Sequence, residues 1–479
     1  MAGVPEGPNA FFRLSPVARS EALCFGLKRG EIDGRFDSNF WRLTPLFRER
    51  FRKPTYPAVP LRSVVSLVQY GCSSLATEAP IGVPMLRMSN LQDDGWDLRE
   101  LKYIELEADE LERYRVLPGD LLFNRTNSKE LVGKCEVFPE SGDWVFASYL
   151  IRVRLRREAV IPQFVSDFLS TRTGRLQIDR LSRQIIGMTN INAEELKEIL
   201  LPLPPPPQQR ELVAAMDAAR AARRAKLTEA DALLAGLDGF LLEILGLTAP
   251  PRPKTTFAVR THQLTDALNP DRYRGLQLEK HLPFASTVGM VGNLLASRCA
   301  PESEGPEQQW DWIRIDDLPN QPWQVETIRT ELGKNIEGTF YEVQENDILV
   351  ARLGPTILNA KFVLCPKLNR RTVASSEFLV IRCAAGWQPE AVLWLLRTAL
   401  YREILYARSR GATPSRFRLN GDDLLSIPFP SMDTDTQMRI AAEARRRRDE
   451  ARRLRSEADS QWQAAKQWFE EQLLGVAQP

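Results

Sequence analysis

A proline-rich stretch followed by a long helical pattern occurs twice in this chain of 479 residues. The first stretch is Leu-Pro-Leu-Pro-Pro-Pro-Pro-Gln-Gln-Arg at 201–210, and the second is Ile-Pro-Phe-Pro at 427–430. Proline fixes φ and biases the preceding residue toward extended geometry, so no helix passes through either stretch. A proline such as Pro207 does suit the first turn of a helix that begins there. Each stretch therefore separates a globular segment from a long helix.

Apolar and small residues recur at alternating spacings of four and three after each proline stretch. The positions run from Leu212 to Ile244 and, 228 residues later, from Ile440 to Gln472. This heptad pattern predicts two long coiled-coil helices, each on the order of 55 Å long at 1.5 Å per residue. The residues expected to pair the helices or to bind partner subunits are Leu212, Met216, Leu233, Leu237, Phe240, Ile440, Leu454, Trp462 and Trp468.

The segments before the two helices are diverged copies of one another. Leu117–Arg125 matches Gln344–Arg352, a turn and an apolar strand that ends in arginine, and Ala147–Arg154 matches Ser375–Arg382. An amphipathic helix is expected after each pair, around 162–171 and 389–405. These matches predict an α+β fold of two pseudo-symmetric mixed α/β domains, joined by two long antiparallel coiled-coil helices.

The expected boundaries divide the chain into five segments. An N-terminal extension covers 1–34, the first domain 35–205, the first long helix 206–247, the second domain 248–430 and the second long helix 431–477.

Composition excludes several classes of protein. A chain with 43% hydrophobic and 26% charged residues is ordinary globular sequence. The six cysteines are scattered without a close pair, which argues against a disulfide framework and a zinc site and favours a reducing cytoplasm. No signal peptide or membrane span is expected. The net charge of +2 neither predicts nor excludes a nucleic-acid partner, because local clusters matter more than the sum.

Basic, amide and hydroxyl side chains gather on the expected strand ends and loops of each half, as suits contacts to phosphates and base edges. In the first half the candidates are Arg87, Asn90, Asn124, Arg125, Asn127, Ser128, Lys129, Lys134, Thr189 and Asn190. In the second half they are Arg314, Arg352, Lys361, Arg408, Arg410, Thr413, Ser415 and Arg416. Each could equally be a solvated loop or turn residue, but the matched placement of Arg125 and Arg352 favours a nucleic-acid surface.

Enzymatic motifs are scarce. Two histidines leave little material for histidine-based catalysis, and neither a P-loop nor the Asn-Pro-Pro-aromatic motif of amino-methyltransferases is present. Asp179, Glu195 and Lys197 fit loosely the carboxylate set of a metal-dependent nuclease. Seven arginines at 445–455 fit either a solvated helix face or a surface for phosphates or a partner.

Four motifs resemble the specificity subunit of type I DNA restriction and modification systems, and the resemblance covers nearly the whole chain. They are Arg-Phe-Asp-Ser-Asn-Phe-Trp at 35–41, Pro-Gly-Asp-Leu-Leu-Phe-Asn-Arg at 118–125, Val-Gly-Lys at 132–134 and Pro-Leu-Pro-Pro-Pro-Pro-Gln-Gln-Arg at 202–210. The second copy departs from the pattern, because Asn346-Asp347 replaces Gly-Asp and the segment 431–437 replaces the polyproline-Gln run.

The resemblance implies two target recognition domains, each reading one half of a bipartite double-stranded DNA site, with helices whose length sets the unread gap. It implies a non-catalytic chain in a cytoplasmic phage-defence complex, with no cofactor or metal of its own. The helices would dock two DNA adenine methyltransferase subunits that use S-adenosylmethionine. Motor-nuclease subunits, which use ATP and Mg²⁺, can join them.

Three alternatives remain open at this point. The chain could be an adaptor of a related defence complex that modifies DNA without cleaving it, and the sequence does not separate this from the type I case. It could be the metal-dependent nuclease, or a structural scaffold whose charges bind protein.

Overall fold

A computed structural model gives the fold. It describes Leu27, 37–92, 95–129, 131–185, 188–247, 270–279, 282, 284, 286–319, 322, 324–411, 413 and 416–475. The expected N-terminal extension, apart from Leu27, lies outside these residues. The chain divides into two compact units, unit 1 from 1–226 with 456–479, and unit 2 from 227–455. No helix in the described ranges has an apolar stretch long enough to cross a membrane.

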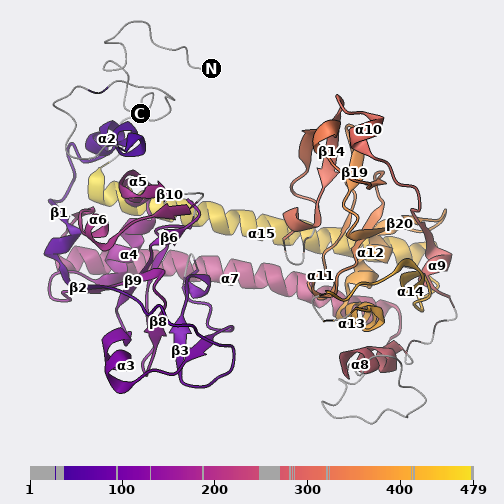
Figure 1. The fold of residues 1–479 in the computed structure, drawn as a ribbon, viewed down its shortest axis with the longest axis horizontal. Coiled ribbons are helices and arrows are strands. Elements are labelled where there is room, and N and C mark those ends of the chain that lie inside the picture. Colours follow the sequence, from indigo (N-terminus) through magenta and orange to yellow (C-terminus); the bar gives the residue numbers. More distant parts are fainter. Residues whose placement is uncertain are drawn as a thin grey trace, which may run out of the picture. The chain divides into compact units, whose positions relative to one another are not determined.

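Unit 1 is built on two small mixed or antiparallel sheets (Figure 1). The first has the order β2-β9-β5-β7, and its strands are Val65–Tyr70, Leu150–Leu155, Leu121–Asn124 and Cys135–Val137. The second has the order β4-β3-β8, with strands Lys102–Ile104, Val83–Leu86 and Val145–Phe146. The central strand β5 is buried along its whole length, which explains its continuous apolar run.

Short elements complete unit 1. Two further small sheets pair β1 (Ala58–Pro60) with β12 (Leu200–Pro202), and β10 (Arg183–Ile185) with β11 (Met188–Asn190) and β6 (Thr126–Asn127). The helices are α2 (Ser38–Arg50), α3 (Ala108–Tyr114), α4 (Pro162–Ser170), α5 (Arg172–Leu181) and α6 (Ala193–Lys197), with 3₁₀ turns at Leu61–Ser63 and Met88–Asn90.

Unit 2 repeats this architecture. Its sheets have the orders β13-β20-β17-β18 and β15-β14-β19-β16. The strands are β13 (Gly292–Leu294), β14 (Gln309–Ile313), β15 (Arg329–Leu332), β16 (Tyr341–Glu342), β17 (Ile348–Ala351), β18 (Phe362–Leu364), β19 (Thr372–Ala374) and β20 (Phe378–Cys383). The helices are α8 (Pro270–Glu279), α9 (Val288–Val291), α10 (Pro301–Glu304), α11 (Gly354–Leu358), α12 (Pro389–Arg397), α13 (Ala399–Arg408) and α14 (Gly421–Leu425), with 3₁₀ turns at Ile315–Asp317 and Gly333–Asn335.

A buried ion pair recurs at the same place in both units. Arg154 on β9 donates two hydrogen bonds of 2.7 Å to the carboxylate of Asp120, which also accepts the backbone N–H of Leu117. Arg382 and Asp347 repeat this pair at 2.7 and 2.8 Å. The residue before each aspartate, Gly119 and Asn346, has φ of +90° and +70°. The turn therefore survives the replacement of glycine, because asparagine tolerates this left-handed conformation.

Two helices follow each strand pair, α4 and α5 in unit 1 and α12 and α13 in unit 2. Thr171 ends α4 and caps α5 by accepting the N–H of Gly174 at 3.1 Å, and Thr398 lies likewise between α12 and α13. Both threonines have extended backbone angles. A hydroxyl that caps a helix favours such a break. The helical stretch expected around 162–171 is confirmed as α4, whereas the stretch expected around 389–405 is divided at Thr398 into α12 and α13.

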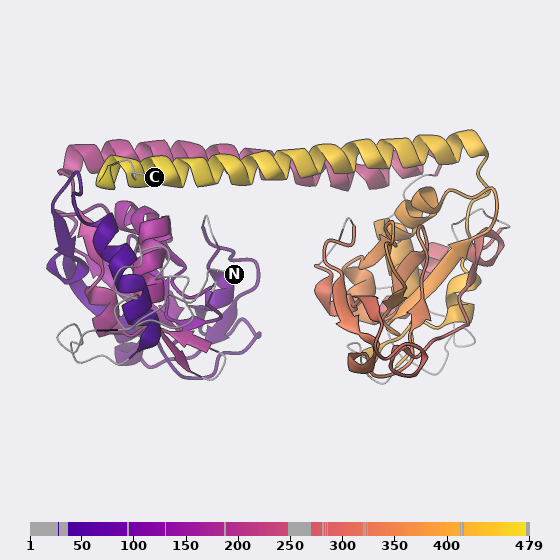
Figure 2. The same cartoon turned by 90° about the horizontal axis from the view of Figure 1, so that it is seen from above.

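Two long helices, α7 (Pro206–Ile244) and α15 (Thr434–Leu474), run side by side and antiparallel in each unit (Figure 1). In unit 1, Arg223 pairs with Asp459 at 3.1 Å, and in unit 2, Asp231 pairs with Arg455 at 2.7 Å. Within each unit the sheets lie to one side of this helix pair (Figure 2). The predicted α+β fold of two related mixed domains with two long antiparallel helices is confirmed.

In each unit, the buried apolar residues of the long helices pack against the domain of that unit. Leu212 and Met216 pack with Trp462 and Phe469 in the main core of unit 1. Leu237, Ile440 and Leu454 pack with Trp394 of α12 in unit 2. The heptad frame holds to Ala458 and then moves by one residue, so that Trp468 is 39% exposed and Phe469 is buried. The shift follows from contact with the domain, where Phe164 of α4 packs on Phe469.

A buried glutamine attaches the start of each long helix to its domain. Gln209, the fourth residue of α7, accepts the N–H of Ile161 at 2.8 Å and donates to the carbonyls of Pro204 and Ala159. Gln437, the fourth residue of α15, accepts the N–H of Gln388 and donates to the carbonyls of Met432 and Gly386. The two side chains are 0% and 3% exposed. The same three hydrogen bonds thus fix both helices.

We expect Gln209→Ala to lower the free energy of unfolding of unit 1 by about 3 kcal/mol, because it leaves a buried N–H and two carbonyls without their partner. Gln208→Ala is the matched control, since Gln208 is the exposed neighbour on the same helix. Denaturant unfolding with native-state hydrogen exchange would measure both variants. Equal free energies of unfolding for the two variants would contradict the claim that Gln209 attaches α7 to its domain.

Candidate nucleic-acid interface

Five side chains, two of them exposed and three half-buried, form a polar surface where the sheet β10-β11-β6 meets β2 in unit 1. We call it the Arg125 face, and it consists of Tyr70, Arg125, Asn127, Tyr149 and Asn190. The guanidinium of Arg125 lies 4.5 Å from the ring centroid of Tyr70 and 3.5 Å from Oδ1 of Asn190. Tyr70 and Tyr149 are 39% and 51% exposed. A planar cation beside an aromatic ring and an amide combines the groups that contact phosphates and bases.

Backbone hydrogen bonds hold the Arg125 face in place. Arg125 lies between β5 and β6; its N–H donates to the carbonyl of Tyr149, and its carbonyl accepts the N–H of Ile191, both at 3.0 Å. The amide of Asn190 donates to the hydroxyl of Thr126 at 2.9 Å. The face is therefore carried by paired strands rather than by a free loop.

The loop after β6 contributes further candidates. Ser128 and Lys129 are exposed, and Asn127 places its amide nitrogen 3.3 Å from the sulfur of Met88. Lys134, at the far end of the loop, is half-buried and lines a cavity beside the long helices. These residues remain candidates for contact with DNA.

Three candidates of unit 1 are buried. Asn90 accepts the N–H of Arg87 at 3.0 Å and donates to the carbonyls of Asp97 and Glu100, so its amide closes the segment 87–100. Asn124 is 1% exposed and donates to the carbonyl of Leu131. Thr189 is 5% exposed on β11. Their side chains position the loops that carry Arg87 and Lys129, and we leave them out of the proposed contacts.

Unit 2 has a corresponding surface with different side chains. The backbone N–H of Arg352 donates to the carbonyl of Glu377 at 3.1 Å, and its carbonyl accepts the N–H of Leu419 at 2.8 Å. These are the same two backbone hydrogen bonds that Arg125 makes in unit 1. Arg418 stands where unit 1 has Asn190, and it pairs with Glu377 at 2.8 Å. We call Arg352, Glu377 and Arg418 the Arg352 face.

The other candidates of unit 2 are divided between surface and interior. Arg410, Thr413 and Arg416 are exposed beside the Arg352 face, and Ser415 lies outside the described residues. Arg314 lies 5.0 Å from the ring centroid of Trp312, and Lys361 donates to the carbonyl of Ile315 at 3.2 Å.

Arg408 has a structural position instead. It pairs with Glu279 of α8 and donates to the hydroxyl of Ser426 at 2.6 Å. Only 17% of its side chain is exposed. Its prediction as a DNA contact is not retained, because these contacts tie α13 to α8.

Four residues of the two faces were not predicted: Tyr70, Tyr149, Glu377 and Arg418. Tyr70 and the backbone of Tyr149 reach Arg125 only after β2 pairs with β9 and β9 pairs with β5, and nothing in their local sequence marks them. Arg418 had a signal, because it lies 228 residues after Asn190, the offset that relates the two halves.

Most residues predicted to bind partners on the long helices pack inside the chain. Leu212, Met216 and Trp462 are buried in unit 1, and Leu237, Ile440 and Leu454 in unit 2. Leu233 and Phe240 pack partly buried against the same stripe. Trp468, at 39% exposure, is the one of these nine residues that is exposed; Met438 was not among them and is 46% exposed on the same helix.

The seven arginines at 445–455 all pair with carboxylates. Arg445 and Arg448 contact Glu390, Arg446 and Arg447 contact Glu443, and the remaining partners are Asp449, Glu450 and Asp231. Two hydrogen-bonded arginines lower the pKa of Glu443 to about 2. The run is thus an ion-paired helix face.

The residues considered for a nuclease site have local partners. Glu195 accepts the N–H of Asn192 in a capping box and pairs with Arg183 at 2.7 Å, and Lys197 pairs with Glu194. Among the residues that the structure describes, no group of three or more His, Cys, Asp or Glu side chains is arranged to hold a metal ion. Glu195 therefore helps to cap the start of helix α6.

Two curated relatives illustrate what the chain is similar to. It is 28% identical over 209 residues to the type I restriction enzyme EcoKI specificity subunit of Escherichia coli K12, covering 42% of this chain and 44% of that protein. It is 22% identical over 173 residues to the putative type I restriction enzyme MjaX specificity subunit of Methanocaldococcus jannaschii, covering 34% and 41%. The chain thus aligns with less than half the length of these relatives. No family model matches it.

Solved structures of type I restriction and modification proteins are also similar. A chain from a structure of type I complex assembly and conformational transition matches with a TM-score of 0.47 and 14% identity, over 87% of this chain and 96% of that one. The S subunit from M. genitalium matches with a TM-score of 0.39 and 10% identity, over 89% and 97%.

We expect Asn90→Ala to lower the free energy of unfolding by about 2 kcal/mol, since it removes an internal acceptor and two donors. Asn127→Ala, at the half-buried end of β6, should change it by less than about 0.5 kcal/mol. Thermal and denaturant unfolding would compare them. If Asn90→Ala leaves the free energy of unfolding unchanged, the structural role of Asn90 is wrong and Asn90 is again a candidate DNA contact.

Proposed function

We propose that this chain is the DNA specificity subunit of a type I restriction and modification complex. The observation that carries the proposal is the duplicated module, which presents Arg125 and Arg352 just after equivalent strands, among different neighbours. The names of the curated relatives support the same function. Each unit would be a target recognition domain that reads one half of a bipartite site in double-stranded DNA.

The chemistry of the two faces suits different half-sites. The Arg125 face offers one guanidinium, two amides and two tyrosines, whereas the Arg352 face offers two guanidiniums and the carboxylate of Glu377. Arginine pairs bidentately with guanine, asparagine with adenine, and glutamate accepts from cytosine. Equivalent positions with different donors and acceptors would therefore select different bases.

The proposed complex places catalysis in its partners. Two DNA adenine methyltransferase subunits using S-adenosylmethionine would bind the long helices, with the exposed Trp468 and Met438 as contacts. Motor-nuclease subunits using ATP and Mg²⁺ would join in a cleaving system. The chain itself would be non-catalytic, without a cofactor of its own, and cytoplasmic. The proposed domain boundaries are those of the sequence prediction.

An adaptor in a complex that methylates without cleaving is the second candidate, and the Arg125 and Arg352 faces support it equally. A structural scaffold is less supported, because it gives no reason for a half-buried arginine at equivalent strand ends of both units.

The chain with its methyltransferase partner should bind duplex DNA with steep salt dependence. The logarithm of the binding constant should fall against the logarithm of salt concentration with a slope of roughly −0.9 per phosphate neutralised. Fluorescence anisotropy between 50 and 200 mM salt, as order-of-magnitude limits, would measure it. A flat response would contradict the proposal and favour the scaffold.

Arg125→Ala should weaken binding by about 1–3 kcal/mol and relax specificity within one half-site. Arg352→Ala should do the same for the other half-site. Arg125→Lys should not restore specificity, because lysine lacks the bidentate fork. Arg52→Ala is the control, since Arg52 is exposed and pairs only weakly with Glu49 at 3.5 Å. Competition against DNA with single-base changes would assign each effect, and identical relaxation by both variants would contradict separate readers.

A further inference from the structure

Two exposed side chains with large apolar parts border Arg125 in unit 1. One is Tyr149, whose carbonyl accepts the N–H of Arg125 at 3.0 Å, and the other is Met188 on β11, which is 49% exposed. Side chains two residues apart on a strand point to the same side, so Met188 lies beside Asn190, about 6.6 Å along the strand. Oδ1 of Asn190 is 3.5 Å from the guanidinium of Arg125. Apolar groups therefore adjoin the polar groups of the Arg125 face.

Met188 lies where its sheet is narrow. β10 and β11 pair antiparallel from Arg183 with Asn190 to Ile185 with Met188, whereas β6 pairs with Thr189 and Asn190. At Met188 the described sheet is therefore two strands wide. A two-stranded ribbon fits the major groove of B-DNA, so this end of the ribbon can bring Met188 to the edges of the bases.

An arginine occupies the position of Met188 in unit 2. Arg418 pairs with Arg410 in the way that Asn190 pairs with β10 in unit 1. Arg416, which is exposed and lies two residues before Arg418, therefore corresponds to Met188. The second domain thus presents a guanidinium where the first presents a thioether.

A carboxylate occupies the position of Tyr149 in unit 2. The carbonyl of Glu377 accepts the N–H of Arg352 at 3.1 Å, as the carbonyl of Tyr149 does for Arg125. The carboxylate of Glu377 pairs with Arg418 at 2.8 Å. Unit 2 therefore has charged side chains at both positions where unit 1 has Tyr149 and a methionine.

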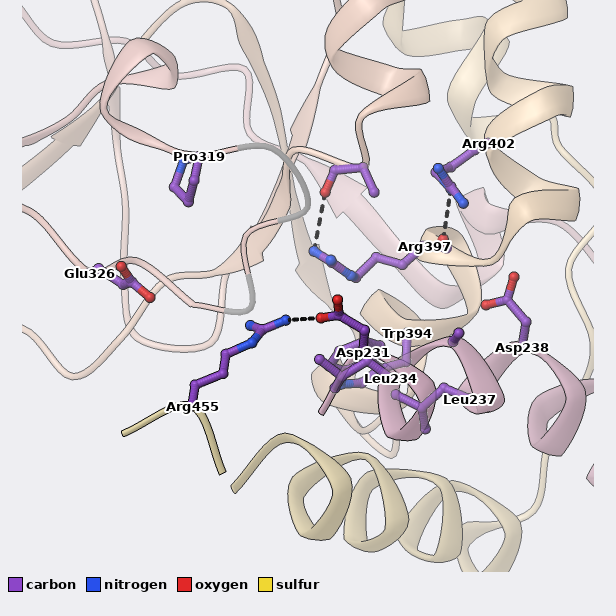
Figure 3. Close-up of a pocket in the computed structure, with 12 residues that line it drawn as sticks. Asp231, Leu234, Leu237, Asp238, Pro319, Glu326, Trp394, Arg397, Arg402 and Arg455 are labelled. Carbon is purple, nitrogen blue, oxygen red and sulfur yellow. Dashed lines mark hydrogen bonds and ion pairs between the residues drawn. The ribbon is translucent and has the colours of Figure 1, made fainter. Parts of the chain in front are cut away.

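Apolar groups of unit 2 lie at a different place. A cavity of about 630 Å³ between its domain and the long helices is lined in part by Leu234, Leu237 and Trp394 (Figure 3). None of the described residues that line this cavity belongs to the Arg352 face. The cavity is therefore no counterpart of the apolar groups beside Arg125.

We infer that Met188 and Tyr149 contact the C5-methyl group of a thymine in the half-site that unit 1 reads. This contact rests on the proposed function and adds to it the kind of base that one domain selects. The thymine methyl is the apolar group that base edges present in the major groove, where the other groups that are read are hydrogen-bond donors and acceptors. Arg125 and Asn190 would bind such polar groups beside the methyl, whereas the charged Arg352 face would read its half-site without an apolar contact at these positions.

The test uses the full chain bound to its methyltransferase partner and duplexes that carry the methylated motif. Deoxyuridine replaces thymine at one position at a time, which removes the methyl group and leaves the hydrogen-bonding groups of the base unchanged. The half-site of unit 1 is the one whose specificity Arg125→Ala relaxes. At one thymine of this half-site, the wild-type complex should bind the thymine duplex about fourfold more tightly than the deoxyuridine duplex, as expected for burial of one methyl group.

Variants of Met188 should change this ratio of affinities. Met188→Ala should bring it toward equality, whereas Met188→Leu should retain most of it, because leucine keeps an apolar side chain. Met188 is half exposed, so both variants should unfold at the wild-type temperature. Met290→Ala is the matched control, since Met290 is an exposed methionine of unit 2, and it should leave the ratio unchanged.

Variants of Tyr149 give an independent measurement of the same contact. Tyr149→Ala should also bring the ratio toward equality. Tyr149→Phe should retain it, because the ring carbons rather than the hydroxyl meet the methyl group.

The possible results separate the methyl contact from the proposed function. If no thymine of that half-site responds to loss of its methyl group, or if Met188→Ala leaves the ratio unchanged while the complex still prefers its motif, the methyl contact is wrong and the specificity role stands. If Met188→Ala weakens binding of the thymine and deoxyuridine duplexes by the same factor, Met188 acts by another contact, such as insertion between base pairs, and the inference is overturned.

Two further results would also reject the methyl contact. Loss of copurifying methyltransferase from Met188→Ala, with an unchanged ratio, would assign Met188 to a protein interface. A wild-type complex that does not bind DNA would reject the proposed function, and the methyl contact with it.

Discussion

The structure depends on a buried glutamine at the fourth position of each long helix. Gln209 and Gln437 satisfy one N–H and two carbonyls of the domain that precedes the helix. Buried polar backbone groups without partners each cost about 1–3 kcal/mol, so the glutamine fixes the helix start as well as stabilising it. Helix α7 begins in a proline run just before Gln209, whereas α15 begins at Thr434 without such a run. Both helices nevertheless have the glutamine at their fourth position.

The two units retain what builds the fold and differ where they would meet DNA. Sheet orders, the buried Asp–Arg pair and the threonine between paired helices occur in both. Around Arg125 and Arg352, however, Asn190 corresponds to Arg418, and Glu377 stands beside Arg352. This pattern is expected of a duplicated reader whose halves recognise different bases while sharing one framework.

Much of the framework could be predicted because local sequence patterns determine it. Proline punctuation, heptad spacing and the repeated strand ending in arginine predicted the duplicated α+β fold. The helix α5 that follows Thr171 and the helix break at Thr398 were missed, since a threonine cap is not distinct from a helical threonine in sequence. Asn90 and Arg408 were assigned to the surface because burial of a polar side chain depends on distant carbonyls and carboxylates. Tyr70 reaches Arg125 only through strand pairing.

The central claim is that this chain chooses the DNA sequence that a partner methylates. The most direct measurement is single-molecule sequencing of methylated DNA from cells that carry the chain with its neighbouring methyltransferase, compared with cells lacking the chain. The account predicts a bipartite adenine-methylated motif that disappears on deletion. Unchanged methylation, with the methyltransferase expressed and active, would contradict it.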